Sequence, residues 1–370
     1  MKILFTIDSL QQGGAEQSIA HLIQHFSKEV SVTVLYFYPK ADLLPVYGSS
    51  GCKIISLNLQ AKYDWRKGVS GLIKVMNEIK PDLVVTSLYR SNIISRIACT
   101  ITGTKLIGTF VDDSYNKERR KTFRGMKLVK YYGTWLLDHI TSSIPSGWIA
   151  NSIYIGKSNA RKLGIAPKKI NVVYRGRNSA DFLEWKDPGN KNFTFTSIGR
   201  LYEKKGYPEL IAAFPDVVKI YPEARLLIYG EGSYRPDLEK QISDLKMNNY
   251  IHLAGNMPGA WKKLYESNCF VFPSRFEGFS GALVEAMMTG IPIIASDIPM
   301  NLEAVENNHT ALVHKLKNEK DISSKMIQMI SGYSKMIEMG SRARREAMSR
   351  FDINIIAKQY EELLARFSNS

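Results

Sequence analysis

Short apolar runs alternate with helical patterns along the whole chain. In the first half, apolar runs predict strands at 2–8, 31–38, 53–57, 83–87, 104–111, 148–150 and 170–174, and helical periodicity predicts helices at 15–26 and 71–79. In the second half, the same patterns predict strands at 193–198, 225–229, 250–253, 269–273, 293–295 and 311–313, and helices at 207–220, 235–246, 260–266, 281–289 and 320–330. This alternation predicts parallel sheets with helices on both faces.

A turn-rich stretch interrupts the alternation at 181–192, where the sequence reads Asp187-Pro188-Gly189-Asn190. The length of 370 residues suits two domains. We therefore predict two doubly wound α/β domains facing each other across a cleft, formed by residues 1–180 and 181–352. An amphipathic helix at 353–370 is expected to cross back to the first domain. Ligands of such sheets bind beyond the carboxyl ends of the strands.

The net charge of +15 is confined to the first predicted domain. Residues 1–180 contain 26 Lys and Arg against 11 Asp and Glu, whereas residues 181–370 contain 24 of each. Such a field attracts an anionic surface, either phospholipid headgroups or nucleic acid. The sequence has no helix-turn-helix, zinc-finger or RNA-binding signature, so we expect a membrane surface as partner and no nucleic acid.

The apolar runs are too short to predict a transmembrane helix or a signal peptide. Cys52, Cys99 and Cys269 lie far apart and lack metal-ligand spacing, which predicts free thiols. We therefore expect a cytoplasmic protein, peripheral on the inner face of the plasma membrane, with no metal and no cofactor.

A basic, aromatic-rich segment between 117 and 137 contains the densest positive charge. Its composition fits an amphipathic helix lying in a membrane interface. The predicted membrane contacts are Arg119, Arg120, Lys121, Arg124 and Lys127. The alternative, a solvated basic face on an ordinary packed helix, stays open.

The first candidate for binding chemistry follows the predicted strand that ends at Ile198. The loop Gly199–Gly206 places Arg200 and Lys205 where α/β sheets bind ligands. Arg offers a planar fork to a diphosphate, and Lys offers a point charge. A basic surface loop is the alternative interpretation.

The second candidate covers residues 272–287. A strand ends at Pro273, a loop follows, and a helix begins at about Gly281 with Ser280 as its N-cap. The free N–H groups and the positive end of the helix dipole predict a phosphate site. Glu277 in the loop and Glu285 on the helix lie eight positions apart, and a carboxylate facing the ligand can bind sugar hydroxyls.

Residues 277–285 resemble the E-x7-E signature of the retaining glycosyltransferases of family 4, which have the GT-B fold. The resemblance continues at 273–274, 285–287, 290–297 and 303–305. Gly199-Arg200 with Lys205-Gly206 is similar to the diphosphate loop of that family, and 13–16 to its glycine loop.

The resemblance implies a retaining hexosyltransferase that moves a sugar from a nucleotide-diphosphate sugar to a saccharide or lipid-linked saccharide. The sequence does not separate UDP from GDP as the donor nucleotide, and UDP is favoured. Polysaccharide, lipopolysaccharide or glycolipid synthesis is then the expected role. Arg200 and Lys205 would stabilise the departing diphosphate, Glu277 would orient the sugar, and Glu285 would hold the ribose. The rest of the implied donor site is Gly14, Gly199, Gly230, Phe279, Ser280, Gly281, Ala282 and Leu283.

One departure from the family pattern falls at Val111, where members often have a His. Asp112 or Asp113 could take over its polar role, and with Glu16 they are the candidate contacts to the sugar or the acceptor. The resemblance implies that front-face transfer passes the acceptor proton to a donor phosphate oxygen, so Val111 does not exclude catalysis.

Two other functions are weighed against a glycosyltransferase. Sugar-nucleotide 2-epimerases share this architecture but need no acceptor. A non-catalytic scaffold that binds nucleotide sugars and membranes would show no turnover.

Overall fold

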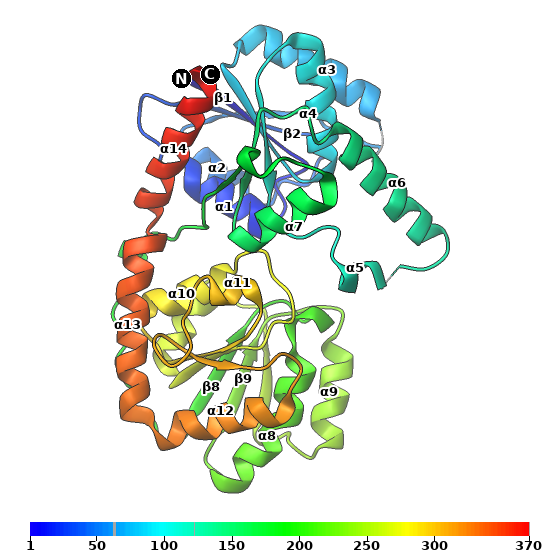
Figure 1. The fold of residues 1–370 in the computed structure, drawn as a ribbon. Coiled ribbons are helices and arrows are strands. Elements are labelled where there is room, and N and C mark those ends of the chain that lie inside the picture. The colour runs from blue at the N-terminus through cyan, green and yellow to red at the C-terminus, as the bar shows by residue number, and fades with distance from the viewer. Residues whose placement is uncertain (62–63, 122, 370) are drawn as a thin grey trace. The chain divides into compact units, whose positions relative to one another are not determined.

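A computed structural model describes residues 1–61, 64–121 and 123–369 (Figure 1). The chain divides into two compact units. Unit 1 comprises Met1–Gly176 and Ile353–Ser370, and unit 2 comprises Arg177–Asp352. The first boundary therefore lies four residues before the predicted end of the first domain, at 180.

In the described part of unit 1, seven parallel strands form one sheet in the order β3-β2-β1-β4-β5-β6-β7. The strands are β1 (Lys2–Ile7), β2 (Ser31–Tyr36), β3 (Lys53–Ser56), β4 (Leu83–Ser87), β5 (Leu106–Phe110), β6 (Gly147–Ala150) and β7 (Ile170–Val172). The helices are α1 (Gly14–Ile23), α2 (Leu44–Gly48), α3 (Trp65–Ile79), α4 (Tyr89–Thr102), α5 (Lys117–Lys121), α6 (Met126–Thr141), α7 (Ile153–Leu163) and α14 (Ile353–Asn369). The strand order reverses between β1 and β4, which is where a doubly wound sheet leaves room for a ligand.

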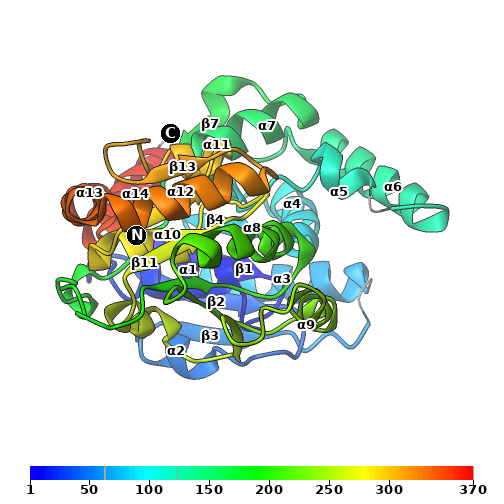
Figure 2. The same cartoon turned by 90° about the horizontal axis from the view of Figure 1, so that it is seen from below.

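Helices cover both faces of this sheet because successive strand residues point to opposite sides (Figures 1 and 2). Ile3, Phe5 and Ile7 of β1 join a core with residues of α1 and α14. Leu4, between them, joins a second core with residues of α3 and α4.

Unit 2 contains, among its described residues, six parallel strands in the order β10-β9-β8-β11-β12-β13. They are β8 (Thr194–Ile198), β9 (Arg225–Tyr229), β10 (Ile251–Gly255), β11 (Cys269–Phe272), β12 (Ile293–Ser296) and β13 (Leu312–His314). The helices are α8 (Tyr207–Ile220), α9 (Arg235–Asp244), α10 (Gly281–Thr289), α11 (Pro299–Leu302), α12 (Glu319–Ser331) and α13 (Tyr333–Phe351). The order reverses between β8 and β11, so the loops after these two strands open at one point of the sheet edge.

The structure contains strands at all the positions where apolar runs predicted them, and no strand end differs from its predicted position by more than two residues. Five described helices have no counterpart in the sequence prediction: α2, α4, α7, α11 and α13. The predicted helix at 260–266 is a 3-10 helix, η4 (Ala260–Glu266). The turn-rich stretch 181–192 belongs to unit 2 rather than linking two domains, because Trp185 is buried and donates from Nε1 to the carbonyl of Ser267.

The basic segment forms two helices, α5 and α6, where the sequence suggested one. Asp138 is the only buried residue of α6, whose residues are all described. Its carboxylate accepts from Nη1 of Arg96 at 2.6 Å and from the hydroxyl of Tyr115 at 2.8 Å. The Arg96 side chain is fully buried and stacks over the ring of Trp148, so a charged pair fixes the inner face of α6.

Candidate functional site

Two loops meet at the point of unit 2 where the strand order reverses. Residues 199–206 leave the carboxyl end of β8, and residues 273–280 leave the carboxyl end of the adjacent strand β11. The backbone N–H of Arg275 donates to the carbonyl of Lys204 at 2.8 Å, which joins the loops directly. The loops that the sequence singled out separately are therefore neighbours.

Close backbone packing explains two of the glycines here. Gly206 has a φ of +72°, and a Cβ atom on it would lie 2.0 Å from the carbonyl oxygen of Pro273. A Cβ atom on Gly230, which follows β9, would lie 2.0 Å from the carbonyl oxygen of Gly199. Only glycine allows these approaches, which bring three strand-end loops together.

Ion pairs between the two loops hold their side chains in place. Nζ of Lys205 lies 2.5 Å from Oε1 of Glu277, and each side chain is little more than a tenth exposed. Arg275 pairs with Glu203 at 2.9 Å and with Glu209 at 2.5 Å. Arg200 is exposed and stacks over the ring of Tyr202, so its guanidinium is accessible to a ligand.

The Glu277 carboxylate is held in its ionised form. Burial by itself raises the pKa of Glu277. The charges of Lys205 and Lys204, together with the hydrogen bond that Lys205 donates to Glu277, outweigh burial and lower the pKa of Glu277 below its ordinary value. An ionised Glu277 can accept hydrogen bonds from sugar hydroxyls without first losing a proton.

The N-terminus of α10 supplies backbone donors beside these loops. The Ser280 side chain caps the helix by accepting from the N–H of Leu283. The N–H groups of Gly281 and Ala282, in the first turn, have no partner among the described residues. Such donors and the positive end of the helix favour an anion.

A third cation, Arg177, lies against the same helix. Its Nε donates to Oε1 of Glu285 at 2.7 Å, and both side chains are largely buried. A Cβ atom on Gly281 would lie 1.8 Å from Nη2 of Arg177, which places the guanidinium directly over the start of α10. Arg177 and Lys205 are each paired with a glutamate and Arg200 is exposed, so the three cations place N–H donors suited to a diphosphate at this edge of unit 2.

Unit 1 has its own small cavity, of about 70 Å³, at the carboxyl ends of its strands. Its lining includes Ser87, Val111, Asn151 and Arg175 and is mostly apolar. The Asn151 side chain donates to the carbonyl of Val111 at 2.9 Å. The Arg175 guanidinium lies next to Gly14, at the start of α1.

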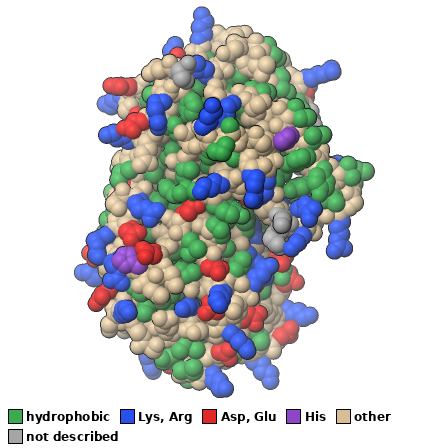
Figure 3. Space-filling view, viewed as in Figure 1, with side chains coloured by type: hydrophobic (Ala, Val, Ile, Leu, Met, Phe, Trp, Pro, Cys, Tyr) green, Lys and Arg blue, Asp and Glu red, His purple; other side chains and the backbone are tan. Residues whose placement is uncertain are grey.

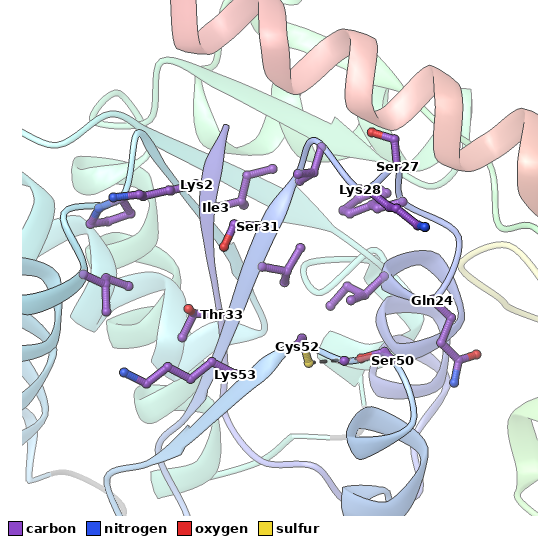
Figure 4. Close-up of a pocket in the computed structure, with 17 residues that line it drawn as sticks. Lys2, Ile3, Gln24, Ser27, Lys28, Ser31, Thr33, Ser50, Cys52 and Lys53 are labelled. Carbon is purple, nitrogen blue, oxygen red and sulfur yellow. Dashed lines mark hydrogen bonds between the residues drawn. The ribbon is translucent and has the colours of Figure 1, made fainter.

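Another cavity, of about 510 Å³, lies at the opposite edge of the unit 1 sheet (Figure 4). It is lined by the first residues of three strands, Lys2, Ser31 and Lys53, together with Cys52 and Lys28. Lys53 is paired with Glu78. Ligands of parallel α/β sheets bind at the carboxyl ends of the strands, so this cavity does not lie at the edge of the unit 1 sheet where a ligand is expected.

Two family models together match most of the chain. Residues 12–180 match the model described as "Glycosyltransferase Family 4", and residues 181–346 match "Glycosyl transferases group 1". The chain belongs to the group 1 glycosyltransferases. Its fold is the GT-B fold, with one parallel α/β sheet in each unit.

Curated relatives of this glycosyltransferase differ in how much of their length it covers. An uncharacterised glycosyltransferase of Methanocaldococcus jannaschii is 27% identical over 61% of this chain and 58% of that protein. The capsular polysaccharide biosynthesis glycosyltransferase CapM of Staphylococcus aureus is 23% identical over 81% of both chains. The UDP-Gal:alpha-D-GlcNAc-diphosphoundecaprenol alpha-1,3-galactosyltransferase of Escherichia coli is 24% identical over 78% of this chain and 76% of that one.

A solved structure with the same fold is that of Anabaena Alr3699/HepE in complex with UDP and glucose. The match covers 99% of this glycosyltransferase and 100% of the Anabaena chain, with a TM-score of 0.85 and 19% sequence identity. At this identity the likeness establishes the fold.

Several residues predicted as ligand contacts have buried side chains that contact other residues of the glycosyltransferase fold. Asp113 is fully buried and paired with Lys162 at 2.6 Å, so its carboxylate serves the interior of unit 1. Phe279 is buried against Phe351, which leaves only its backbone for a donor. Glu16 is buried, with its carboxylate turned back onto Gly13.

The remaining predicted contacts are more accessible. Asp112 is half-exposed and forms a 3.4 Å ion pair with Arg119. Ala282 is half-buried and Leu283 is buried, and the N–H of Leu283 already donates to the Ser280 side chain. The predicted membrane contacts Arg119, Arg120, Lys121, Arg124 and Lys127 are all exposed.

Sequence reasoning missed Arg177 and the role of Arg275. Arg275 lies within the candidate region 272–287, but the sequence predicts no role for it. Arg177 follows β7 in a segment without a recognisable motif, so no signal in the sequence connected it to Glu285.

No group of three or more His, Cys, Asp or Glu among the described residues is placed to hold a metal ion. None of the described helices is both long enough and apolar enough to span a bilayer.

Proposed function

We propose that this chain is a retaining hexosyltransferase that uses a UDP-sugar as donor. The convergence of Arg200, Lys205 and the first amides of α10 at one point of the unit 2 sheet carries the proposal. Breaking the anomeric C–O bond leaves negative charge on the nucleoside diphosphate, and fixed donors aimed at that charge lower the barrier. The UDP-containing structure of the Anabaena neighbour supports the choice of nucleotide.

Glu277 and Glu285 are assigned to the two sugars of the donor. Glu277, ionised and held by Lys205, orients the transferred sugar, and Glu285 binds the ribose hydroxyls. Gly199 and Gly230 allow the backbone of unit 2 to approach the donor closely. In front-face transfer, the acceptor hydroxyl gives its proton to the donor phosphate oxygen that leaves, so no separate base and no metal ion is assigned.

The acceptor is proposed to be a saccharide linked through a diphosphate to a membrane lipid, in cell-surface polysaccharide or lipopolysaccharide synthesis. The acceptor that the Escherichia coli relative is named for supports this class. Unit 1, whose sequence carries the excess positive charge, binds this acceptor at the cytoplasmic face of the plasma membrane. Asp112 is the exposed carboxylate proposed to contact it.

Contact with an anionic membrane is assigned to α5 and α6. The outward face of α6 exposes Met126, Val129, Leu136 and Ile140, each at least half exposed. Figure 3, viewed as in Figure 1, shows apolar and cationic side chains together over this region. Apolar side chains flanked by cations are the pattern of an interfacial helix.

The donor assignment is tested by incubating the chain with UDP-sugars and a lipid-linked saccharide and measuring UDP release and product. Release that depends on acceptor, with the product's anomeric configuration retained, is expected. Conversion of the UDP-sugar to its epimer without acceptor would show an isomerase instead, and binding without turnover would show a scaffold.

The membrane assignment is tested by sedimentation with phosphatidylglycerol vesicles. Charge reversal at Arg119, Arg120 and Lys121 is expected to reduce the bound fraction, and raised salt is expected to do the same. Unchanged partitioning after charge reversal would contradict it.

A further inference from the structure

A cavity of about 340 Å³ lies between the inner face of α6 and the loop that follows β5. Its lining includes three aromatic side chains, Tyr115, Phe123 and Tyr131, and three cations, Arg119, Lys127 and Lys130. We call it the tyrosine cavity. Its volume lies in the range typical of sites for small ligands.

The tyrosine cavity lies at the edge of the sheet where ligands bind. Tyr89, another lining residue, begins α4 two residues after the end of β4. Tyr115 follows the end of β5, and β4 pairs with β5. Both segments therefore leave the carboxyl ends of neighbouring parallel strands.

Contacts between rings build the aromatic wall. Tyr131 packs against Tyr115 at 5.9 Å and against Phe123 at 5.4 Å between ring centroids. The Tyr115 hydroxyl is fixed by its bond to Asp138. The wall is therefore part of the fold and not a chance meeting of surface side chains.

Two of the cations that line the cavity, Lys127 and Lys130, are exposed. Lys127 and Lys130 make no ion pair with any described side chain, and the pair of Arg119 with Asp112 is long and half-exposed. Asp138, the other acidic residue at this wall, is engaged by Arg96 and Tyr115. The balance of charge around the cavity is positive, as a diphosphate requires.

The sequence of α6 places the residues that line the cavity and the exposed apolar residues on two different faces of the helix. Lys127, Lys130, Tyr131 and Thr134 recur at three- and four-residue intervals, so they share the face that lines the cavity. The exposed apolar residues of the outward face, Met126, Val129, Leu136 and Ile140, recur with the same intervals on another face. The inner face of α6 is thus cationic and aromatic and lines the cavity, whereas its outward face is apolar and exposed.

We propose that the tyrosine cavity binds the diphosphate group of an isoprenoid-diphosphate-linked acceptor. The cations bind the diphosphate, and the aromatic rings pack against the first isoprene unit or the first sugar ring. This inference rests on the proposed function, because it gives the lipid-linked acceptor a binding site.

The experiment measures binding of farnesyl diphosphate to the full chain by calorimetry. Saturating UDP is present, so that the diphosphate does not bind at Arg200 and Lys205. The test variant is Lys130→Gln with Tyr131→Ala, neither of which is an assigned membrane contact. The matched control is Lys157→Gln with Tyr154→Ala, which changes the same residue types at exposed positions of α7.

We expect farnesyl diphosphate to bind the wild type and the control equally, and the test variant at least tenfold more weakly. Farnesol, which lacks the diphosphate, should not bind, and inorganic pyrophosphate should bind more weakly than farnesyl diphosphate. Equal affinity of the test variant and the control would overturn the proposal, and so would equal binding of farnesol.

Binding to phosphatidylglycerol vesicles distinguishes ligand binding in the cavity from adsorption of the protein to a membrane surface. The test variant should partition onto vesicles like the control, and a parallel loss of vesicle and farnesyl diphosphate binding would overturn the cavity as a distinct site. Failure of the donor assignment would appear separately, as absence of UDP binding or of UDP release. Failure of the cavity alone would leave UDP binding intact.

Discussion

Arg177 and Glu285 form a largely buried ion pair across 2.7 Å, although 108 residues separate them in the chain. The same guanidinium covers Gly281, whose N–H is one of the donors of the proposed diphosphate site. Arg177 thus fixes a carboxylate and adds a charge at the start of one helix. This arrangement makes the function of Glu285 depend on a residue outside the motif.

Replacement of Arg177 by Ala should weaken UDP binding by about 10- to 100-fold, the range for a lost hydrogen bond to a charged group. Because Glu285 would lose its fixed position, the variant should also lose most of the preference for UDP over 2′,3′-dideoxy-UDP. Titration calorimetry with both nucleotides measures this preference. A variant that keeps the full preference would show that Arg177 does not position Glu285, and Arg177→Lys should restore part of it.

Replacement of Gly281 by Ala should reproduce the binding defect of Arg177→Ala without unfolding the protein. The new Cβ meets only the far end of a flexible side chain, which can move away. Gly206→Ala is the contrasting variant, because its Cβ meets the carbonyl of Pro273 and its φ is +72°. Thermal unfolding should therefore be near wild type for Gly281→Ala and clearly lowered for Gly206→Ala. A large loss of stability in Gly281→Ala would contradict the account of Arg177.

Arg200→Ala should reduce kcat/KM by about 100- to 1000-fold, equivalent to ~3–4 kcal/mol, while the unfolding temperature stays unchanged. Arg200 is exposed and contacts the ring of Tyr202, so the fold does not need it. Lys205→Ala should lower both activity and stability, because it leaves the Glu277 carboxylate buried without its cation. Lys240→Ala, on the exposed side of α9, is the control. Undiminished turnover in Arg200→Ala would refute its assignment.

His314 should make unit 2 less stable in mild acid. The ring is buried, Nδ1 donates to the carbonyl of Lys315, and Nε2 has no partner among the described residues. Burial lowers the pKa of His314 below 6.5 in the folded chain, although a carbonyl and nearby carboxylates act in the opposite direction. Below pH 6.5 the unfolded chain therefore binds a proton that the folded chain does not, and the free energy of unfolding falls until the pH reaches the lowered pKa.

Urea unfolding between pH 5 and 7.5 measures this effect. His314→Gln should remove part of the slope, at most about 1.4 kcal/mol per pH unit. His252→Gln, at an exposed position of β10, should leave the slope as in the wild type. An equal slope in wild type and His314→Gln would contradict the prediction.

The strands and their parallel arrangement could be predicted because buried strands are nearly continuous apolar runs, as in Leu83–Ser87 and Cys269–Phe272. The loops after β8 and β11 were also predictable, since glycine, cations and a helix cap follow each other closely in the sequence. Helices such as α13, which is long and mostly polar, gave too weak an apolar pattern.

Pairings between distant residues could not be predicted. Asp113 looked like a candidate ligand contact because it stands at a strand end, yet Lys162 and Ser158 engage it in the interior. Likewise, Glu277 and Glu285 were recognised as carboxylates, but their cations, Lys205 and Arg177, lie 72 and 108 residues away. A linear sequence specifies which side chains are charged, and the fold decides which of them remain for a substrate.

The attachment of α6 through Asp138 has a consequence for how this chain could change during evolution. Because α6 is held from its inner side, by the bonds of Asp138 and by the bond of Trp135 to the carbonyl of Lys162, the outward residues Met126, Val129, Leu136 and Ile140 add little to the hydrophobic core. Substitutions among them can accumulate at small cost in stability. Related chains could therefore vary this one face while the rest of unit 1 stays the same.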